Sequence, residues 1–267
     1  MDRDGQFIRM TREEFRDWVK DEKVSRKISM IQNHHTYRPN YAGFNGRNHF
    51  DLCKGMRNYH MTQWKFPARD IAQNITTFSD GMIVICRPLW DFPAGIFNQN
   101  REAICIEHVG NFHTGGDNMS EEHKKTIIFI NAVLAERLRL PIDVQHFVYH
   151  HWYDGNGVRR NGANAQSTCP GANFFGGNKV PDADREFIPL IKNEFVKLTV
   201  KEVIDMGRKI FKDTEGRWSD NDVLLCSEKG IVKKAENFRP MDAVTREENA
   251  AMFARLIRKL EGVGIKI

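Results

Sequence analysis

The sequence predicts an α/β domain with a mixed central β-sheet flanked by helices over residues 1–200, and a small all-α domain over residues 201–267. Segments typical of helices and of strands are interspersed through the first part, which is the pattern of an α/β fold. The chain has 267 residues, of which 40% are hydrophobic, so it can bury a sizeable core and hold two domains. The pattern changes near residue 200, and we place the boundary there. The strand order does not follow from this pattern.

A capping box predicts the first helix. The run Thr-Arg-Glu-Glu that begins at Thr11 starts a short amphipathic helix, which extends to about Val24 with Phe15 and Trp18 on one face. Strand-like runs are predicted at residues 28–35, 70–77, 82–87 and 103–109. The sequence Ser-Asp-Gly at 79–81 is a turn, so we expect the middle two strands to form a hairpin.

The second half of this domain is predicted from a long helix onward. Ser120 caps a helix that extends to about Leu138, because its apolar residues recur at helical spacing. A strand at 144–150 and a helix at 183–198 follow. Residues 154–168 are rich in Gly, Asn, Arg, Ala and Ser, and a polar loop of this length is usually functional or mobile. Residues 49–60 form a further predicted helix, which would border a cleft.

Charge and cysteine content exclude some classes of protein. The net charge of +5 is small and spread over both parts of the chain, so no nucleic-acid partner is expected. The N-terminus has acidic residues and no apolar run, and no later stretch reaches the ~20 apolar residues of a membrane span. We therefore expect a soluble cytoplasmic protein without a secretory signal. The five scattered cysteines indicate reduced thiols, with Cys86 and Cys105 in the core.

Three segments can supply ligands to one divalent metal ion. They are Asn-His-His-Thr at 33–36, the pair His150-His151, and Thr-Cys-Pro-Gly at 168–171. Two imidazoles and one thiolate suit zinc much better than magnesium or calcium. Three protein ligands leave one open position, where a water has its pKa lowered to about 7 and becomes a nucleophile. The sequence therefore predicts a zinc-dependent hydrolase.

Several ordered motifs within residues 25–200 resemble a known family. They are His34-His35-Thr36-Tyr37, Asp80-Gly81, Arg87-Pro88, the run from Ile104 to Phe112, a strand ending in His150, and Thr168-Cys169-Pro170-Gly171. Together they resemble the zinc-dependent N-acetylmuramoyl-L-alanine amidases, which include phage endolysins, bacterial autolysins and peptidoglycan recognition proteins. The resemblance implies zinc bound by His34, His150 and Cys169, with His151 as an alternative to His150. It also implies hydrolysis of the amide that joins N-acetylmuramic acid to L-alanine in peptidoglycan.

Two further catalytic residues follow from this resemblance. Glu107 lies in an apolar run, where an acid is costly unless it is satisfied or used, and several branches of the family have a catalytic glutamate there. We expect it to take a proton from the zinc-bound water and pass it to the leaving amine, with a structural salt bridge as the competing role. Ser167 stands where the family often has Lys or Thr to bind the oxyanion, and could donate one hydrogen bond.

Gln73 replaces a family tyrosine and cannot act as a phenol. Five other histidines are expected to be surface or packing residues: His49, His60, His113, His123 and His146.

The C-terminal part resembles one S-layer-homology module. The motifs that carry this resemblance are Phe211-Lys212-Asp213, Trp218, residues 229–232, Phe238-Arg239-Pro240 and residues 244–248 before an apolar-periodic helix. In that family the module binds secondary cell-wall polysaccharide through a Thr-Arg-Glu motif, so Arg246 would contact an anionic glycan group, although a helix cap with a solvated Arg246 explains the motif equally well. Such modules commonly occur in threes, and the single copy motivates two hypotheses: a homo-dimer or homo-trimer, or weak binding by one copy alone.

The setting that these features favour is a phage or prophage endolysin. Such a protein would stay in the host cytoplasm until lysis and then act on the cell wall, and an autolysin exported by another route is the second interpretation. Two alternatives from other classes remain. One is a non-catalytic peptidoglycan receptor with the same fold. The other is a cysteine peptidase that uses Cys169, although Pro170 directly after the thiol is unusual for a nucleophile at a helix N-terminus.

Overall fold

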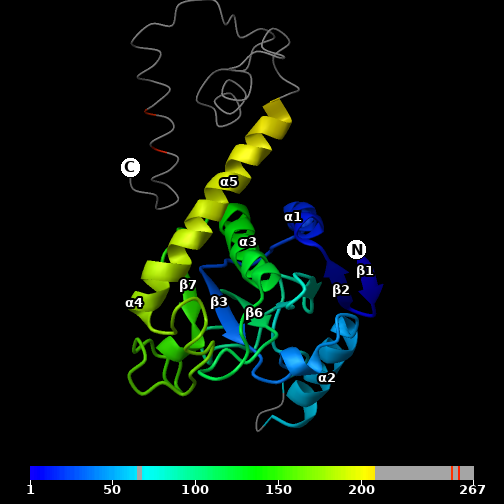
Figure 1. Cartoon of the computed structure of the whole chain (residues 1–267), viewed down its shortest axis with the longest axis vertical. Helices are drawn as coiled ribbons and strands as arrows, with labels where there is room; N and C mark the ends of the chain where they lie inside the picture. The colour runs from blue at the N-terminus through cyan, green and yellow to red at the C-terminus, as the bar shows by residue number, and fades with distance from the viewer. Residues whose placement is uncertain (65–67, 208–253, 255–257, 259–267) are drawn as a thin grey trace, which may run out of the picture. The chain divides into compact units, whose positions relative to one another are not determined.

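The computed structural model describes residues 1–64, 68–207, 254 and 258, and it divides the chain into two compact units, Met1–Ile191 and Lys192–Ile267 (Figure 1). The predicted all-α domain, with Arg246 and Cys226, lies almost entirely outside the described residues. The boundary at residue 200 therefore stays a prediction. A helix, α5 (Ile188–Gly207), runs through that position.

The first unit is built on a seven-stranded mixed sheet with the order β1-β2-β5-β4-β6-β3-β7. The strands β4, β6, β3 and β7 are parallel neighbours, whereas β1, β2 and β5 pair antiparallel. This confirms the predicted mixed sheet flanked by helices. The strand bounds are β1 Asp2–Asp4, β2 Phe7–Met10, β3 Met30–His35, β4 Ile75–Thr77, β5 Ile83–Ile85, β6 Ala103–His108 and β7 Phe147–Tyr149.

All five predicted strands occur, each of them shorter than predicted. The Ser79–Gly81 turn joins β4 to β5 as an antiparallel hairpin, as expected, and Gly81 has the positive φ of +88° that favours glycine at this position. The hairpin of β1 and β2 was not predicted, because its strands are only three and four residues long and every residue of β1 is charged. Short strands leave too few positions for a period of two to be recognised.

The helices begin where the capping residues predict. In α1 (Arg12–Asp21) the Thr11 hydroxyl accepts from the Glu14 N–H and the Glu14 carboxylate accepts from the Thr11 N–H, which is a complete capping box. Ser120 caps α3 (Glu121–Leu138) in the same way through the His123 N–H. The predicted helix at 49–60 is α2 (His49–Thr62). The last predicted helix consists of α4 (Val180–Asp182), a π-helical turn (Ala183–Phe187) and α5.

The two faces of the sheet are covered differently. Helix α3 contacts β4 and α1, and it carries a nearly continuous buried face against the sheet (Figure 1). On the opposite face, Cys53 and Met56 of α2 pack with Phe7, Val84 and Cys86 in a hydrophobic cluster. Because side chains alternate along a strand, Asn33 faces α3 whereas His34 faces the other side. That other side, next to α2, holds the site. Among the described residues, no helix is long and apolar enough to cross a bilayer.

Candidate metal centre and active site

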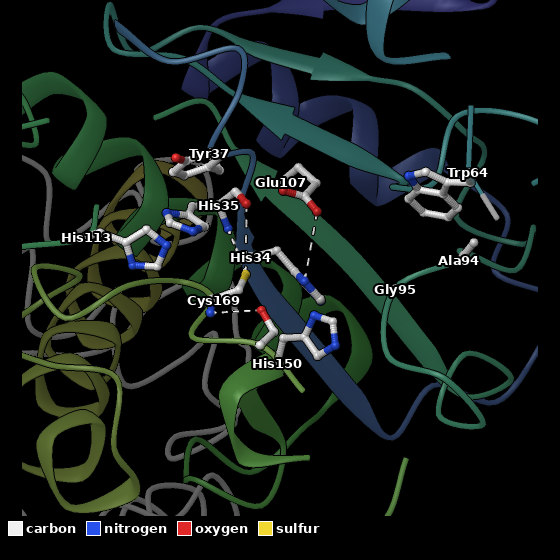
Figure 2. Close-up of a pocket in the computed structure, with 11 residues that line it drawn as sticks. His34, His35, Tyr37, Trp64, Ala94, Gly95, Glu107, His113, His150 and Cys169 are labelled. Atoms are coloured by element: carbon white, nitrogen blue, oxygen red, sulfur yellow. Dashed lines mark hydrogen bonds and ion pairs between the residues drawn. The ribbon is translucent and has the colours of Figure 1, made fainter. Parts of the chain in front are cut away.

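Three neighbouring parallel strands bring the predicted residues together at one edge of the sheet. His34 and Glu107 are direct partners in the register of β3 and β6, so their side chains point to the same face. His150 follows directly after β7, the strand on the other side of β3. Side chains at the carboxyl ends of parallel strands converge, which is where α/β sheets commonly form their sites. Residues 34, 107 and 150, far apart in sequence, therefore face one space (Figure 2).

The Cys-Pro-Gly turn supplies the fourth side chain. The Cys169 carbonyl accepts from the His151 N–H at 2.8 Å, and its Sγ accepts from the His35 N–H at 3.2 Å. Gly171 has a φ of +100°, and a Cβ there would collide with the backbone of Phe112. Only glycine therefore allows the turn to lie against this loop and hold Cys169 under the end of β3.

His34, His150 and Cys169 form a group that fits a zinc ion. Their ligand atoms all lie within 4.8 Å of one another, and the His34 and His150 ring centroids are 5.0 Å apart. His34 is only 3% exposed, and its Nε2 has no hydrogen-bond partner among the described residues. Imidazole nitrogen and thiolate sulfur are both zinc ligands, and three protein ligands leave the open position of a catalytic site. His34, Cys105 and Glu107 form a second group within the same limit of 4.8 Å, so the choice between the two groups is open to experiment.

Burial keeps both imidazoles in the form that a metal requires. It lowers the pKa of His34 well below the ordinary value, with His150 and His35 adding to the effect. Burial, assisted by His151, lowers the pKa of His150 to about 4. Both rings are therefore neutral near pH 7, and a neutral ring has a free nitrogen lone pair for coordination. Burial also raises the pKa of Cys169 well above its usual value, with Glu107 contributing, so this thiol becomes a thiolate only with a cation beside it.

The carboxyl group of Glu107 makes few polar contacts. Its Oε1 lies 3.9 Å from His34 Nδ1, and its Oε2 has no hydrogen-bond partner among the described residues. Burial raises the pKa of Glu107 to about 8. A carboxyl group with this pKa can hold and release a proton near neutral pH, as general acid–base chemistry requires. No lysine or arginine pairs with it among the described ion pairs, which argues against the structural salt bridge.

The structure separates His150 from its neighbour. His150 lines the cavity, whereas His151 Nδ1 bonds to the Ser167 carbonyl oxygen at 2.9 Å and its ring lies beside Gly162. Ser167 also lines the cavity, and its Oγ accepts from the Cys169 N–H at 3.0 Å. Because that bond uses a lone pair of the oxygen, the Ser167 hydroxyl proton stays available for a ligand.

The cavity has a volume of ≈ 380 Å³ and includes residues that the sequence did not point to. Tyr37 and His113 lie on one side with His35, and Trp64 lies with Ala94 and Gly95 on the other (Figure 2). His113 was expected on the surface or in packing, and its edge instead meets the His35 ring at a centroid distance of 4.7 Å. Tyr37 lies only two residues after His35, so the sequence could have suggested that Tyr37 lines the cavity. Nothing near Trp64 in the sequence indicates a site.

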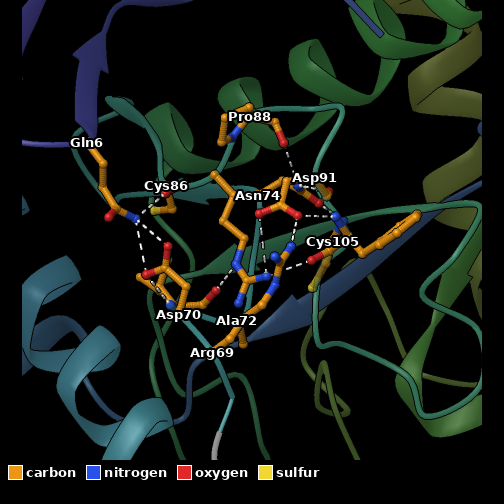
Figure 3. Close-up of polar contacts among 12 residues, drawn as sticks. Gln6, Arg69, Asp70, Ala72, Asn74, Cys86, Pro88, Asp91 and Cys105 are labelled. Carbon is orange, nitrogen blue, oxygen red and sulfur yellow. Dashed lines mark hydrogen bonds and ion pairs between the residues drawn. The ribbon is translucent and has the colours of Figure 1, made fainter. Parts of the chain in front are cut away.

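A polar anchor holds the loop that carries Ala94 and Gly95. Asn74 is fully buried, and its Nδ2 donates to the carbonyl oxygens of Pro88 and Asp91 at 3.1 and 3.0 Å (Figure 3). Its Oδ1 accepts from the Cys105 N–H at 3.1 Å, which ties the loop to β6. Arg87, 2% exposed, adds a bond to the Phe92 carbonyl oxygen at 2.6 Å.

Gln73 takes no part in the site. It is fully buried, and its Nε2 donates to Thr76 Oγ1 at 2.9 Å instead of lining the cavity. The other histidines expected in packing roles include His49 and His123, which are 1% and 0% exposed. Cys86 and Cys105 are buried in the core, and Cys53, Cys86, Cys105 and Cys169 are free thiols.

Comparison with known proteins places this geometry in a family. The family model for N-acetylmuramoyl-L-alanine amidase matches residues 24–172, more than half of the chain, and the model for the S-layer homology domain matches residues 210–250. No curated protein matches.

Several solved structures are similar to this chain. The N-acetylmuramoyl-L-alanine amidase LysC from Clostridium intestinale URNW is 19% identical with a TM-score of 0.42, over 57% of this chain and 82% of that one. Drosophila PGRP-LB is 17% identical with a TM-score of 0.46, over 61% of this chain and 84% of that one. Bumblebee PGRP-SA is 16% identical with a TM-score of 0.44, over 57% of this chain and 83% of that one. On the strength of the family model over residues 24–172, the chain belongs to the N-acetylmuramoyl-L-alanine amidase family.

Proposed function

We propose that this chain is a peptidoglycan hydrolase that cleaves the amide between N-acetylmuramic acid and L-alanine, with zinc held by His34, His150 and Cys169. The observation that carries the proposal is the convergence of these three ligands, all within 4.8 Å, beside the carboxyl group of Glu107, whose Oε2 has no hydrogen-bond partner among the described residues. Zinc, when bound there, supplies Lewis-acid activation of water and of the scissile carbonyl group.

The other roles belong to side chains of the cavity. Glu107 would accept a proton from the attacking water and deliver it to the leaving nitrogen of L-alanine. A cation bound next to His34 would favour the ionised carboxylate, which is the form of Glu107 that acts as a base. The free Ser167 proton would donate to the carbonyl oxygen as negative charge develops on it.

The test of the metal site is zinc content combined with product release. We expect one zinc per chain, lysis that is lost with chelator and restored by zinc, and new L-alanine amino groups in wall digests. Cys169→Ala and His150→Ala should lose the zinc, whereas the matched neighbours Cys105→Ala and His151→Ala should keep it. Loss of zinc in Cys105→Ala but not in Cys169→Ala would move the metal to the second group.

Two other outcomes would replace the proposal. Wall binding with no new amino groups would favour the non-catalytic receptor. Activity that resists chelation but is lost on thiol alkylation would favour the cysteine peptidase. The structure gives that peptidase little support, because Cys169 is 7% exposed and its pKa is raised, whereas reactive thiols are accessible and have lowered pKa values.

We further propose that the S-layer homology region attaches the enzyme to secondary cell-wall polysaccharide, and that the protein acts as an endolysin on the wall. The support is the pairing of the two family regions in one chain. Arg246→Ala in the full chain should reduce the fraction bound to walls severalfold and leave hydrolysis of a soluble muropeptide unchanged. Arg258→Ala, at an exposed arginine of the predicted 201–267 domain outside the matched residues 210–250, is the control. Equal binding by both variants would contradict the role of Arg246.

A further inference from the structure

A chain of buried side-chain hydrogen bonds runs behind the site, on the α3 face of the sheet. It begins at Asn33, which precedes His34 in β3. Asn33 Oδ1 accepts from Asn131 Nδ2 of α3 at 3.0 Å and contacts His108 Nε2 of β6 at 3.1 Å. Asn33 Nδ2 donates back to Asn131 Oδ1 at 3.1 Å. Asn33, His108 and Asn131 are all fully buried, so water cannot replace these bonds.

The chain continues across β4 to the start of α3. His108 Nδ1 and His123 Nε2 each lie 2.7 Å from Thr77 Oγ1, one on either side of the hydroxyl. His123 Nδ1 lies 2.8 Å from the Tyr41 hydroxyl oxygen, which accepts from the Ser120 N–H at 3.1 Å. Thr77 and His123 are also fully buried. The network therefore links three adjacent strands to one helix.

Burial lowers the pKa of both His108 and His123, so both rings are neutral near pH 7. With neutral rings, only one arrangement of protons satisfies this network. Asn131 Nδ2 also donates to the Ile127 carbonyl oxygen at 2.8 Å, and a carbonyl can only accept, so the orientation of both amides follows. Asn33 Oδ1 must then accept from His108 Nε2–H, which leaves His108 Nδ1 to accept from Thr77.

The same logic fixes the other half. The Thr77 hydroxyl uses its proton in the hydrogen bond to His108, so its oxygen must accept from His123 Nε2–H. His123 Nδ1 must then accept from the Tyr41 hydroxyl. Each bond of the chain then joins one donor to one acceptor, and both histidines carry their proton on Nε2. A single proton order of this kind specifies one geometry, which apolar packing would not do to the same extent.

The position of the network gives it a role at the site. Asn33 is adjacent to His34 in β3, and His108 is adjacent to Glu107 in β6. Because side chains alternate along a strand, Asn33 and His108 point to the face of the sheet opposite the site. We propose that His108, held between Asn33 and Thr77, is a positioning residue that sets the lateral spacing of β3 and β6 and so aligns His34 and Glu107 for the metal ion and the reacting water. This inference rests on the proposed function. Removing a residue that orients metal ligands without binding the metal itself typically lowers metal affinity by about 10- to 100-fold.

The decisive test compares three substitutions in the full chain. Thr77→Val is isosteric and removes only the hydroxyl that joins the two histidines. His108→Leu removes the link to Asn33, whereas His108→Gln keeps one donor and one acceptor. We expect zinc affinity, measured by chelator competition, to fall about 10- to 100-fold in His108→Leu and by a smaller factor in Thr77→Val. In both variants kcat on a soluble muropeptide should fall while KM stays unchanged. His108→Gln should restore the zinc affinity and kcat.

A matched control separates positioning from stability. Thr126 of α3 is buried, and its hydroxyl donates to the Gly81 carbonyl oxygen at 2.8 Å outside the network. Thr126→Val should lower the melting temperature as much as Thr77→Val but leave zinc affinity and kcat at the wild-type level. If Thr77→Val and His108→Leu lower only the melting temperature, this inference fails and the proposed function stands. If the wild-type chain binds no zinc, both are overturned.

Discussion

Glu107 shows how one residue takes its chemistry from its surroundings. It follows four apolar residues in β6, partners His34 in the register, and has one carboxylate oxygen without a hydrogen-bond partner among the described residues. Removal from water disfavours the charged form, which raises the pKa of Glu107 to about 8. A buried acid without a compensating partner costs stability, so its presence is best explained by its use.

The residue-scale prediction concerns this carboxyl group. Glu107→Gln keeps the shape of the side chain but cannot exchange a proton, so we expect kcat to fall by roughly 10²- to 10⁴-fold. Zinc content should be unchanged, since the three proposed ligands remain. The measurements are amino-group release from a soluble muropeptide and metal analysis. Glu13→Gln, at an exposed position of α1, is the control. Full activity in Glu107→Gln would remove Glu107 from the mechanism.

At the scale of elements, the site depends on how irregular segments are fastened to the sheet. The parallel strands present His34 and Glu107, but Ala94, Gly95, Ser167 and Cys169 come from loops. The loop after Arg87 is held by Asn74, which bonds Pro88, Asp91 and Cys105 at once (Figure 3). A loop fastened by buried side-chain bonds can be irregular and still fix the wall of a cavity.

Replacing Asn74 tests this fastening. Asn74→Ala leaves the buried Cys105 N–H without its acceptor, whereas the Pro88 and Asp91 carbonyl oxygens each keep one other donor, the Asp91 N–H and Arg26. The free energy of unfolding should therefore fall by about 1–3 kcal/mol. Urea denaturation with an unchanged m-value would measure the loss. Asn58→Ala, at an exposed position of α2, should change it by less than about 0.5 kcal/mol. A loss in Asn74→Ala no larger than in Asn58→Ala would show that the loop is held by other contacts.

At the scale of the whole molecule, the interior is rich in neutral histidine. Burial lowers the pKa of His123 to about 3, and burial assisted by Arg87 lowers that of His60 to about 4. In the unfolded chain a histidine titrates near 6.5. Between these values the unfolded chain binds protons that the folded chain does not, so stability is present above about pH 6.5 and is lost progressively as the pH falls toward 3.

This linkage predicts an acid-sensitive fold whose sensitivity can be assigned to one residue. Between pH 7 and pH 4 the wild-type protein should lose on the order of 3 kcal/mol more than His123→Gln, because glutamine keeps a donor and an acceptor but binds no proton. Urea denaturation at several pH values in the presence of chelator gives the comparison. Parallel pH dependences in the two proteins would show that His123 is not the source.

Local signals in the sequence determined many parts of this molecule. Capping boxes and N-caps at Thr11 and Ser120 placed α1 and α3, and the Ser79–Gly81 turn placed the hairpin of β4 and β5, because these features act over a few residues. The donor types of His34, His150 and Cys169 indicated zinc before any geometry was known. The resemblance of the ordered motifs to amidases was confirmed by the family model.

Only the tertiary structure decided the strand order, the convergence of the ligands and the rest of the cavity. Trp64, His113 and Gly95 reach the site because distant loops fold beside it, and sequence periodicity carries no information on such contacts. The choice of His150 for the cavity depends on the 3₁₀ turn after β7, which directs His151 to Ser167. Local preferences are encoded residue by residue, whereas the spacing between strands is set by packing and hydrogen bonds formed only in the folded chain.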